Sequence, residues 1–518
     1  MNTWRLNLNA ATKPLDHFWE LCVGSCHAAT ALREDYRAQL RQASHDCGFR
    51  YVRFHGLFDD DMSVLTGAGM VMSREGGQEY TLSFTNIDSV FDFLLSIGMR
   101  PFVELGFMPK ALTSGQTTIF HYEGHTAPPD DFGKWQWLVE EFTRHCVQRY
   151  GLGEVRQWFF EVWNEPNLGG KGAPMGFWGG DQTDYFHLYE AAARGVKAVD
   201  SRLRVGGPAT ADNSWVPELI DYCRAHQVPL DFITTHNYPT DLGSGSRHGT
   251  ANLMGLAQRE DIPAEERKKM VEAYLSARES LWSRIPRGIL TEWARTTAEE
   301  AQGLPVYYTE WHSSGGLESD GPFGASFIAK TCLDLNGIVQ GYSYWTFTDL
   351  FEEGGMPHTP FHGGFGLLNL QGIPKASYRA FQLLHQLGGT IYEEVYSSGT
   401  VDIYAVRHEA AHAVQLLAVN HQSLQQPVEA QQLSLTLEGL QNGCAAATVQ
   451  RVDADHGNAL GKWQELGCPD YPDQGVIDLL KGASFTRTEA LPFECDGDSV
   501  RVELTVPAQG IALVTLYL

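Results

Sequence analysis

The sequence has little positive charge and no run of basic residues. Its 38 Lys and Arg stand against 63 Asp and Glu, which gives a formal net charge of −25. Surfaces that bind nucleic acid or anionic membranes cluster Lys and Arg to neutralise phosphates. We therefore expect neither nucleic acid nor a membrane surface as a partner.

Long apolar runs and a cysteine framework are missing as well. No window of about 18 residues is apolar enough for a membrane span. The first twenty residues lack the charged-then-apolar pattern of a signal peptide. The nine cysteines are odd in number and thinly spread over 518 residues, which favours reduced thiols over disulfides. We expect a cytoplasmic protein.

Short apolar runs recur eight times in the first three quarters of the chain. They occupy residues 17–27, 49–58, 100–109, 157–166, 202–210, 230–239, 304–314 and 338–353. Runs of this kind are typical of parallel strands buried on both faces. Stretches with helical spacing, such as 32–48, 86–99 and 183–200, lie between them. The pattern predicts a (β/α)8 barrel. A doubly wound sheet is the competing layout, but no G-x-G-x-x-G turn follows the first strand.

Two further regions complete the predicted organisation. We place the barrel at 14–385, with a helical insertion around 240–303 that contains a strongly charged segment at 262–285. After residue 386 the sequence alternates as β-strands between turn residues. We predict that 386–518, joined by 1–13, form an antiparallel β-sandwich.

Polar side chains stand where the barrel strands are expected to end, which is where (β/α)8 barrels carry their active sites. They are His55, Asn164, Glu165, His236, Tyr238, Glu310, Trp345, Glu352 and Glu353. Two carboxyl groups, Glu165 and Glu310, come from strands that face one barrel mouth. Cleavage of a glycosidic bond needs one carboxylic acid to protonate the leaving oxygen and one carboxylate to attack or stabilise the anomeric carbon. A separation of about 5–5.5 Å gives retention, and about 6.5–9.5 Å gives inversion.

The motifs "FEVWNEPNL", "THNYP", "YYTEWHSS" and "YWTFTDLFEE…FHGGFGL" resemble glycoside hydrolase family 39. The resemblance covers the whole proposed barrel and fits a following β-sandwich. Known members of that family include β-xylosidases and α-L-iduronidases, and they retain the anomeric configuration.

The resemblance implies a role for each strand-end residue. Glu165 matches the acid/base and Glu310 the nucleophile. Asn164 matches the amide that binds the sugar 2-hydroxyl. The remaining matches hold the sugar and orient the nucleophile: His55, His236, Tyr238, the apolar floor Trp345, and one of Glu352 and Glu353, with the family pattern favouring Glu353. No cofactor or metal is required, because the two carboxyl groups supply the nucleophile and the proton transfers.

Two buried carboxyl groups need a separate interpretation. Glu104 lies within the third apolar run, where we expect it to form a structural ion pair with Arg53. Glu161 lies in the fourth run, and we expect it to be a bystander in the strand.

A literal H-E-x-x-H, His408 to His412, raises zinc peptidase chemistry as a rival hypothesis. That motif binds zinc only when a helix brings both histidines to one face. Strand-like stretches flank it here, so we expect a hairpin loop instead. A non-catalytic carbohydrate-binding protein is a third class, but both Glu165 and Glu310 are present.

We therefore predict a retaining exo-glycosidase, a β-xylosidase that releases xylose from the non-reducing ends of xylo-oligosaccharides. An α-L-arabinosidase or an α-L-iduronidase-like enzyme is the alternative on the same scaffold. The carboxylate of an iduronide would be repelled by Glu352 and Glu353. Family members often assemble through accessory domains, which favours a homo-oligomer.

Overall fold

The computed structural model describes residues 2–67, 80–171, 176–241, 263, 265–266, 269, 282–440 and 443–518. Its centre is a closed barrel of eight parallel strands, one from each apolar run. These strands are β3 (Cys22–His27), β4 (Tyr51–His55), β7 (Arg100–Leu105), β10 (Phe159–Val162), β11 (Arg204–Thr210), β12 (Phe232–Asn237), β13 (Val306–Trp311) and β14 (Gly341–Tyr344). Pairing of Tyr344 with Val23 joins the last strand to the first. The predicted (β/α)8 barrel is confirmed, and an open doubly wound sheet is excluded.

The two ends of the barrel interior differ in chemistry. A cluster of mainly aromatic residues near the amino ends of the strands consists of Cys22, Tyr51, Phe102, Phe159 and Phe232. Polar and charged side chains occupy the carboxyl ends, where the predicted site residues lie. The apolar cluster provides packing, so the carboxyl end is the place to look for chemistry.

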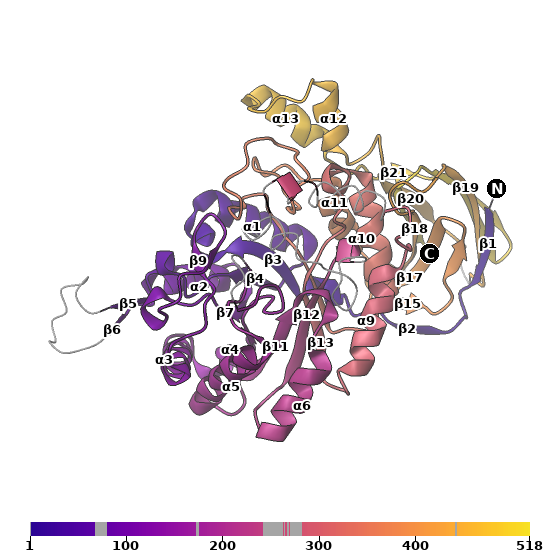
Figure 1. Cartoon of the computed structure of the whole chain (residues 1–518). Coiled ribbons are helices and arrows are strands. Elements are labelled where there is room, and N and C mark those ends of the chain that lie inside the picture. Colours follow the sequence, from indigo (N-terminus) through magenta and orange to yellow (C-terminus); the bar gives the residue numbers. More distant parts are fainter. Residues whose placement is uncertain are drawn as a thin grey trace.

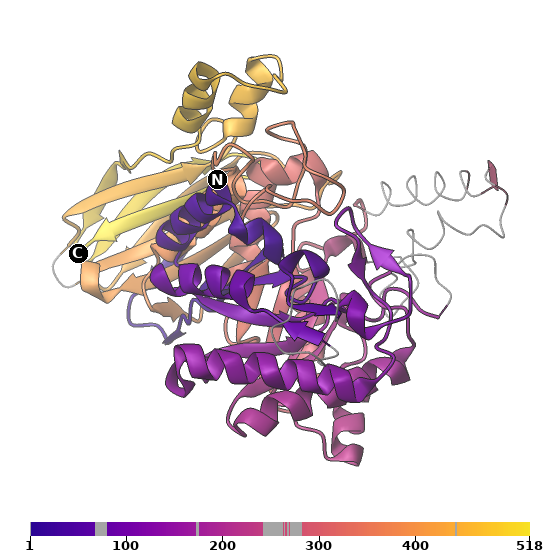
Figure 2. The same ribbon diagram turned by 90° about the vertical axis from the view of Figure 1, so that its left-hand side faces the viewer.

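Helices surround the barrel (Figures 1 and 2). In chain order they are α1 (Glu34–Cys47), α2 (Thr85–Ser96), α3 (Phe132–Tyr150), α4 (Leu152–Val155), α5 (Gln182–Val199), α6 (Val216–His226), α9 (Ile289–Glu300), α10 (Pro322–Asp334) and α11 (Ala376–His385). Local signals set their ends: a capping box of Asp181 and Asp184 starts α5, and Gly48 at φ 74° ends α1. In the described part of the chain, no helix is long and apolar enough to cross a membrane.

The predicted insertion is described only in part. Helix α9 lies within 240–303, whereas most of the charged segment at 262–285 lies outside the described residues. Short elements connect the rest: η1 (Phe18–Glu20), η2 (Ala28–Leu32), η3 (Asp60–Met62), η4 (Lys110–Leu112), η5 (Ala211–Asn213), η6 (Pro239–Asp241), η7 (Gly316–Asp320), and the hairpins β5 (Leu65–Gly67) with β6 (Tyr80–Leu82) and β8 (Thr118–Ile119) with β9 (Gly124–His125).

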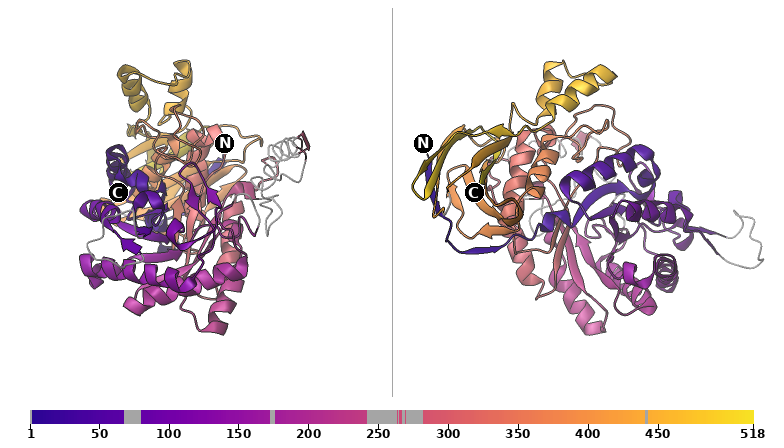
Figure 3. Two further views of the ribbon diagram at one scale, coloured as in Figure 1. Left: turned by 60° about the vertical axis from the view of Figure 1, so that its left-hand side comes forward. Right: turned by 180° about the vertical axis from the view of Figure 1, so that it is seen from behind.

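The C-terminal part folds as the predicted β-sandwich. One sheet runs in the order β1-β19-β23-β22, and the larger sheet in the order β2-β15-β17-β18-β24-β20-β21, with β16 paired to β17. The strands are β1 (Asn2–Asn7), β2 (Thr12–Pro14), β15 (Thr390–Tyr392), β16 (Tyr396–Ser398), β17 (Val401–His408), β18 (Ala413–Asn420), β19 (Gln431–Glu438), β20 (Ala446–Val452), β21 (Glu489–Ala490), β22 (Phe493–Asp496), β23 (Ser499–Val506) and β24 (Ile511–Tyr517). Strand β1 pairs in parallel with β19, so the start of the chain lies at the outer edge of the sandwich (Figure 3).

A pair of helices interrupts the sandwich and was not expected from the sequence. Helices α12 (Ala459–Glu465) and α13 (Gln474–Ala483) stand at the top of the molecule in Figures 1 and 2. Trp463 and Leu480 share a small apolar core with Phe361 from the segment after β14. The two helices belong to the C-terminal part of the chain, and they also contact the segment that follows the last barrel strand.

Candidate active site

Buried polar side chains from five strands and the loops after them converge at the carboxyl end of the barrel. Their exposed fractions are 7% or less, and they are Arg53, His55, Glu104, Glu161, Asn164, Glu165, His236, Thr309 and Glu310. Removing so many charged groups from water is costly unless each finds a partner. Such a cluster indicates a functional site rather than a structural core.

Glu165 follows β10 in a strained turn. Its φ is 41°, in the left-handed region that non-glycine residues rarely adopt, and its amide donates a 2.8 Å hydrogen bond to the carbonyl of Ala209. The turn aims the carboxyl group at His236, whose Nδ1 lies 2.9 Å from Glu165 Oε1. Strain of this kind in a buried residue is common at functional sites.

Glu310 is the last residue but one of β13 and lies beside His236, its partner in the strand register. Arg53 Nη1 donates to Oε1 of Glu310 at 2.7 Å, and the Tyr238 hydroxyl donates to Oε2 at 2.7 Å. Both oxygens therefore have a fixed donor. His236 Nδ1 lies 3.6 Å from Oε2, too far for a hydrogen bond.

The two carboxyl groups are close neighbours. One oxygen of Glu165, one of Glu310 and one ring nitrogen of His236 all lie within 4.8 Å of one another. Inverting glycosidases separate their carboxyl groups by about 6.5–9.5 Å to admit a water, and retaining ones by about 5–5.5 Å. The separation here suits direct attack by one carboxylate on the sugar.

The same three residues form, among the described residues, the one cluster whose geometry could hold a metal ion. Arg53 and Tyr238 already donate to the two oxygens of Glu310. A metal ion bound to that carboxylate would lie close to a permanently charged guanidinium, which repels a cation. The donor set therefore fits an organic substrate better than a cation.

The environments of the two carboxyl groups push their protonation states apart. Burial raises the pKa of Glu165 well above its usual range, and the negative charge of Glu310 adds to the rise. Burial also raises the pKa of Glu310, but the Arg53 guanidinium works against it, as does the Tyr238 hydroxyl. The arrangement favours the protonated form more at Glu165 than at Glu310, which is the division of labour between an acid and a nucleophile.

Arg53 is the centre of the cluster. It donates to Glu161, Glu310 and, at 2.9 Å, to Asn164 Oδ1, and it forms a 3.0 Å ion pair with Glu104. The expected pairing of Arg53 with Glu104 is therefore present. The expectation that Glu161 is a bystander is wrong, because its carboxylate binds both Arg53 and the Thr309 hydroxyl.

Asn164 retains a free donor. Its Oδ1 is held by Arg53, whereas its buried Nδ2 has no hydrogen-bond partner in the described part of the chain. A buried unpaired amide costs about 1–3 kcal/mol. A substrate hydroxyl would satisfy it, as the resemblance implies for the sugar 2-hydroxyl.

His55 and Trp345 form one wall of the site. His55 Nδ1 lies 2.7 Å from Glu104 Oε2, and its ring centre is 4.7 Å from that of Trp345. Burial lowers the pKa of His55 to about 3, so the ring is neutral. Gly24 admits Trp345, because a Cβ at that position would lie 2.5 Å from the indole.

The structure distinguishes Glu353 from Glu352. A carboxyl oxygen of Glu353 lies 3.8 Å from His55 Nε2, and burial together with Glu310 raises its pKa well above the usual range. The Glu352 carboxylate instead lies 3.9 Å from both Arg33 and His27. Glu353 therefore faces the centre of the site, and Glu352 faces its rim.

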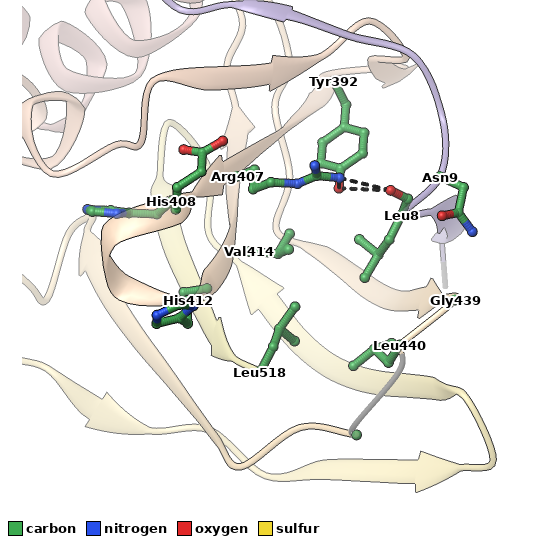
Figure 4. Close-up of a pocket in the computed structure, with 13 residues that line it drawn as sticks. Leu8, Asn9, Tyr392, Arg407, His408, His412, Val414, Gly439, Leu440 and Leu518 are labelled. Carbon is green, nitrogen blue, oxygen red and sulfur yellow. Dashed lines mark hydrogen bonds between the residues drawn. The ribbon is translucent and has the colours of Figure 1, made fainter.

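The H-E-x-x-H motif forms a hairpin, as expected. β17 ends at His408, a short turn, η8 (Glu409–Ala411), follows, and β18 begins at Ala413. The turn leaves His408 and His412 at its opposite ends, beside a pocket of about 630 Å³ that Arg407 and Leu518 also line (Figure 4). The shared helical face that zinc peptidases need is not formed.

Three residues of the site were not predicted from the sequence: Arg53 as its centre, Glu161 as a partner, and Thr309. An arginine within an apolar strand run was a signal, because a buried guanidinium requires carboxylate partners. The alternation of side chains puts Glu161 and Phe159 on one face of β10, and Phe159 points into the barrel. The same alternation predicts that the Glu161 side chain also points into the barrel.

Known proteins are similar to this chain in sequence and fold along most of their lengths. The family model described as "Glycosyl hydrolases family 39" matches residues 3–277 and 279–500. A β-xylosidase of Caldicellulosiruptor saccharolyticus is 43% identical over 99% of this chain and 97% of its own. One of Geobacillus stearothermophilus is 33% identical over 90% of this chain and 86% of its own.

A solved structure agrees with the sequence relatives. The crystal structure of a monomeric β-xylosidase from Caulobacter crescentus CB15 superposes with a TM-score of 0.79 at 31% identity, covering 100% of this chain and 99% of that chain. The resemblance noted from the motifs is confirmed: this chain belongs to glycosyl hydrolase family 39 and is a glycoside hydrolase.

Proposed function

We propose that the protein is a retaining β-xylosidase that releases xylose from the non-reducing ends of xylo-oligosaccharides by double displacement. The observation that carries the mechanism is the placement of one carboxyl oxygen of Glu165 and one of Glu310 within 4.8 Å of each other. The substrate is proposed from the relatives, because the β-xylosidases at 43% and 33% identity align along nearly the whole chain.

In the first step Glu310 attacks the anomeric carbon and forms an ester while the bond to the glycosidic oxygen breaks. Glu165 gives its proton to that oxygen, which leaves as the hydroxyl of the shortened chain. Arg53 and Tyr238 hold the attacking carboxylate from two sides. Asn164 offers its unpaired Nδ2 to the sugar 2-hydroxyl, a contact that strengthens as the oxocarbenium-like charge develops.

In the second step water attacks the anomeric carbon, the bond to the Glu310 oxygen breaks, and xylose and the free carboxylate are released. Esterification removes the charge of Glu310, which is one cause of the raised pKa of Glu165. The pKa of Glu165 then falls, and its carboxylate can take a proton from the attacking water. The two carboxyl groups supply the nucleophile and both proton transfers, so we propose a reaction without cofactor or metal. A chelator such as EDTA should leave the rate unchanged.

The sugar is proposed to lie against the wall formed by Trp345 and His55, within reach of His236 and Glu353. An α-L-iduronide brings a carboxylate to this place. The Arg53 guanidinium is already bound by Glu104, Glu161 and Glu310, and Glu353 adds a further carboxyl group. We therefore favour an uncharged pentose over a uronic acid.

The test compares aryl β-xyloside, α-L-arabinoside, β-glucoside and α-L-iduronide side by side, and follows xylotetraose by product analysis. We expect the highest kcat/KM for the β-xyloside, xylose as the first product, and initial release as the β-anomer in an NMR time course. Preference for the arabinoside or iduronide would move the assignment to that sugar. Release of the α-anomer would contradict the retaining mechanism.

We further propose a cytoplasmic enzyme that acts on imported short xylan fragments and assembles as a homo-oligomer. All nine cysteines are free thiols, six of them buried, which suits a reducing compartment. Fractionation of the producing cells tests the location, and light scattering of the purified protein tests the assembly.

A further inference from the structure

A line of hydrogen bonds runs behind the acid/base residue. The Thr309 hydroxyl lies 2.7 Å from Glu161 Oε1 and 3.2 Å from His236 Nε2, and His236 Nδ1 lies 2.9 Å from Glu165 Oε1. The exposed fractions of Thr309, Glu161 and His236 are 1% or less. Without access to bulk water, the hydrogens along this line must be shared among these groups alone.

The direction of the line is set at Glu161. Its Oε2 binds Arg53, a permanent cation, so the group is a carboxylate that can only accept. The single hydroxyl hydrogen of Thr309 therefore goes to Glu161 Oε1. The Thr309 oxygen is left as an acceptor, and it accepts from His236 Nε2–H.

His236 has only one ring hydrogen to give. Burial lowers its pKa well below the usual range, and Arg53 and His55 lower it further, so the imidazole is neutral. With the hydrogen on Nε2, Nδ1 carries a bare lone pair. A lone pair 2.9 Å from a carboxyl oxygen makes a hydrogen bond only if that carboxyl group is protonated.

We propose that Thr309 is a positioning residue that fixes the Nε2–H tautomer of His236 and thereby keeps the acid proton on Glu165 until the leaving oxygen takes it. The inference rests on the proposed function, in which Glu165 is the acid. The only proton that moves is that of Glu165, which passes to the leaving oxygen as in the first step proposed above; the protonation states of Thr309, His236 and Glu161 stay unchanged. Thr309 thus acts through His236, with Glu161 as its anchor.

The other charged groups around Glu165 act on its pKa through their charge and do not discriminate between the tautomers of His236. The groups facing it from the other elements are Glu310 on β13, Asp241 in η6, Arg53 on β4 and Glu353 after β14. The three acids, Glu310, Asp241 and Glu353, favour the protonated form of Glu165, whereas Arg53 favours its carboxylate form. Among the described residues His236 alone places a hydrogen-bonding ring nitrogen on its carboxyl group, so the tautomer decides whether that contact favours acid or carboxylate.

The test removes the hydroxyl and keeps the shape, with Thr309→Val. His236 is then free to move its hydrogen to Nδ1, which donates to Glu165 and stabilises the carboxylate. Thr309→Ser should restore the wild-type behaviour. Thr234→Val is the matched control: it removes a buried hydroxyl from the adjacent strand β12, and that hydroxyl has no hydrogen-bond partner in the described structure.

The first readout is the tautomer itself, from ¹⁵N NMR of histidine-labelled protein, with the His236 signals assigned by their loss in His236→Gln. We expect Nε2–H in the wild type, Thr309→Ser and Thr234→Val, and Nδ1–H in Thr309→Val. This measurement does not depend on which sugar is the substrate. If Thr309→Val retains Nε2–H, the proposal is wrong.

The second readout separates positioning from structural support. Xylobiose needs acid assistance, whereas 2,4-dinitrophenyl β-xyloside does not. We expect kcat/KM of Thr309→Val to fall at least ~10-fold for xylobiose and to change by less than ~3-fold for the activated xyloside. The basic limb of the xylobiose pH profile should move to lower pH.

Equal losses on both substrates with an unmoved basic limb would overturn the proposal. Should Thr309→Val not fold, Thr309→Ala provides the same two readouts. Failure of the proposed function looks different: the wild type would then lack activity on xylobiose while its His236 tautomer stayed as inferred.

Discussion

The Tyr238 hydroxyl donates a 2.7 Å hydrogen bond to Glu310 Oε2, while Arg53 holds the other oxygen of the same carboxylate. The carboxylate is thereby fixed from two directions at the end of β13. Two properties follow: the orientation of the attacking oxygen, and the charge that makes it a nucleophile.

Tyr238→Phe should lower kcat/KM on xylobiose by about 10-fold, the loss expected for one hydrogen bond to a charged group. The Tyr238 hydroxyl is one of the groups that lower the pKa of Glu310. Its removal should raise that pKa, so the acidic limb of the pH profile moves to higher pH. Steady-state kinetics across the pH range measure both effects. An unmoved acidic limb would show that the hydroxyl does not tune Glu310.

Glu165→Gln should stabilise the fold at neutral pH. The folded-state pKa of Glu165 lies well above the pKa that the residue has in the unfolded chain. At a pH between the two pKa values the folded protein holds a proton that the unfolded chain has released. Stability then falls as pH rises through this window. A glutamine does not titrate, so the variant avoids this loss of stability. Its side-chain NH2 can still donate a hydrogen bond to His236 Nδ1. We expect Tm to rise at pH 7 and to be unchanged below pH 4, by calorimetry at both values. An equal rise at both would contradict the raised pKa.

Glu353→Gln should lower kcat/KM for the β-xyloside by about 10- to 100-fold, because a buried polar group that binds a substrate hydroxyl is hard to replace. Glu352→Gln is the matched control on the neighbouring residue. Its carboxylate faces Arg33 at the rim, where ion pairs contribute little, and its kcat/KM should stay within about 2-fold of the wild type. A larger loss of kcat/KM in Glu352→Gln than in Glu353→Gln would show that Glu352, and not Glu353, binds the sugar.

The architecture could be predicted because each barrel strand is buried on both faces and each run ends in polar residues. The carboxyl groups could be assigned because Glu165 and Glu310 lie toward the ends of two of those runs. The helices α12 and α13 were missed, although Asn458 and Asp473 cap their starts. Their sequences lie among β-type stretches, and that context masked the local signal.

The inner hydrogen-bond network could not be derived from the sequence. The register of β12 and β13 shifts between Thr235 and His236, so that His236 pairs with Glu310. Regular alternation would have paired it with Thr309 instead. A bulge of this kind depends on the packing of the whole barrel, and it sets which atoms His236 touches. The path of the loop after β14 likewise determines that Glu353, and not Glu352, faces the centre of the site.

The central claim is that Glu310 forms a covalent bond to the sugar. A 2-deoxy-2-fluoro-β-xylosyl fluoride slows both steps and leaves the ester to accumulate, because the fluorine destabilises the oxocarbenium-like transition state. Mass spectrometry of the digested protein then locates the added sugar. We predict one fluoroxylosyl group per chain, on the peptide that carries Glu310, and none in Glu310→Ala. A label on another carboxyl group, or turnover of the compound without any labelled peptide, would contradict the account.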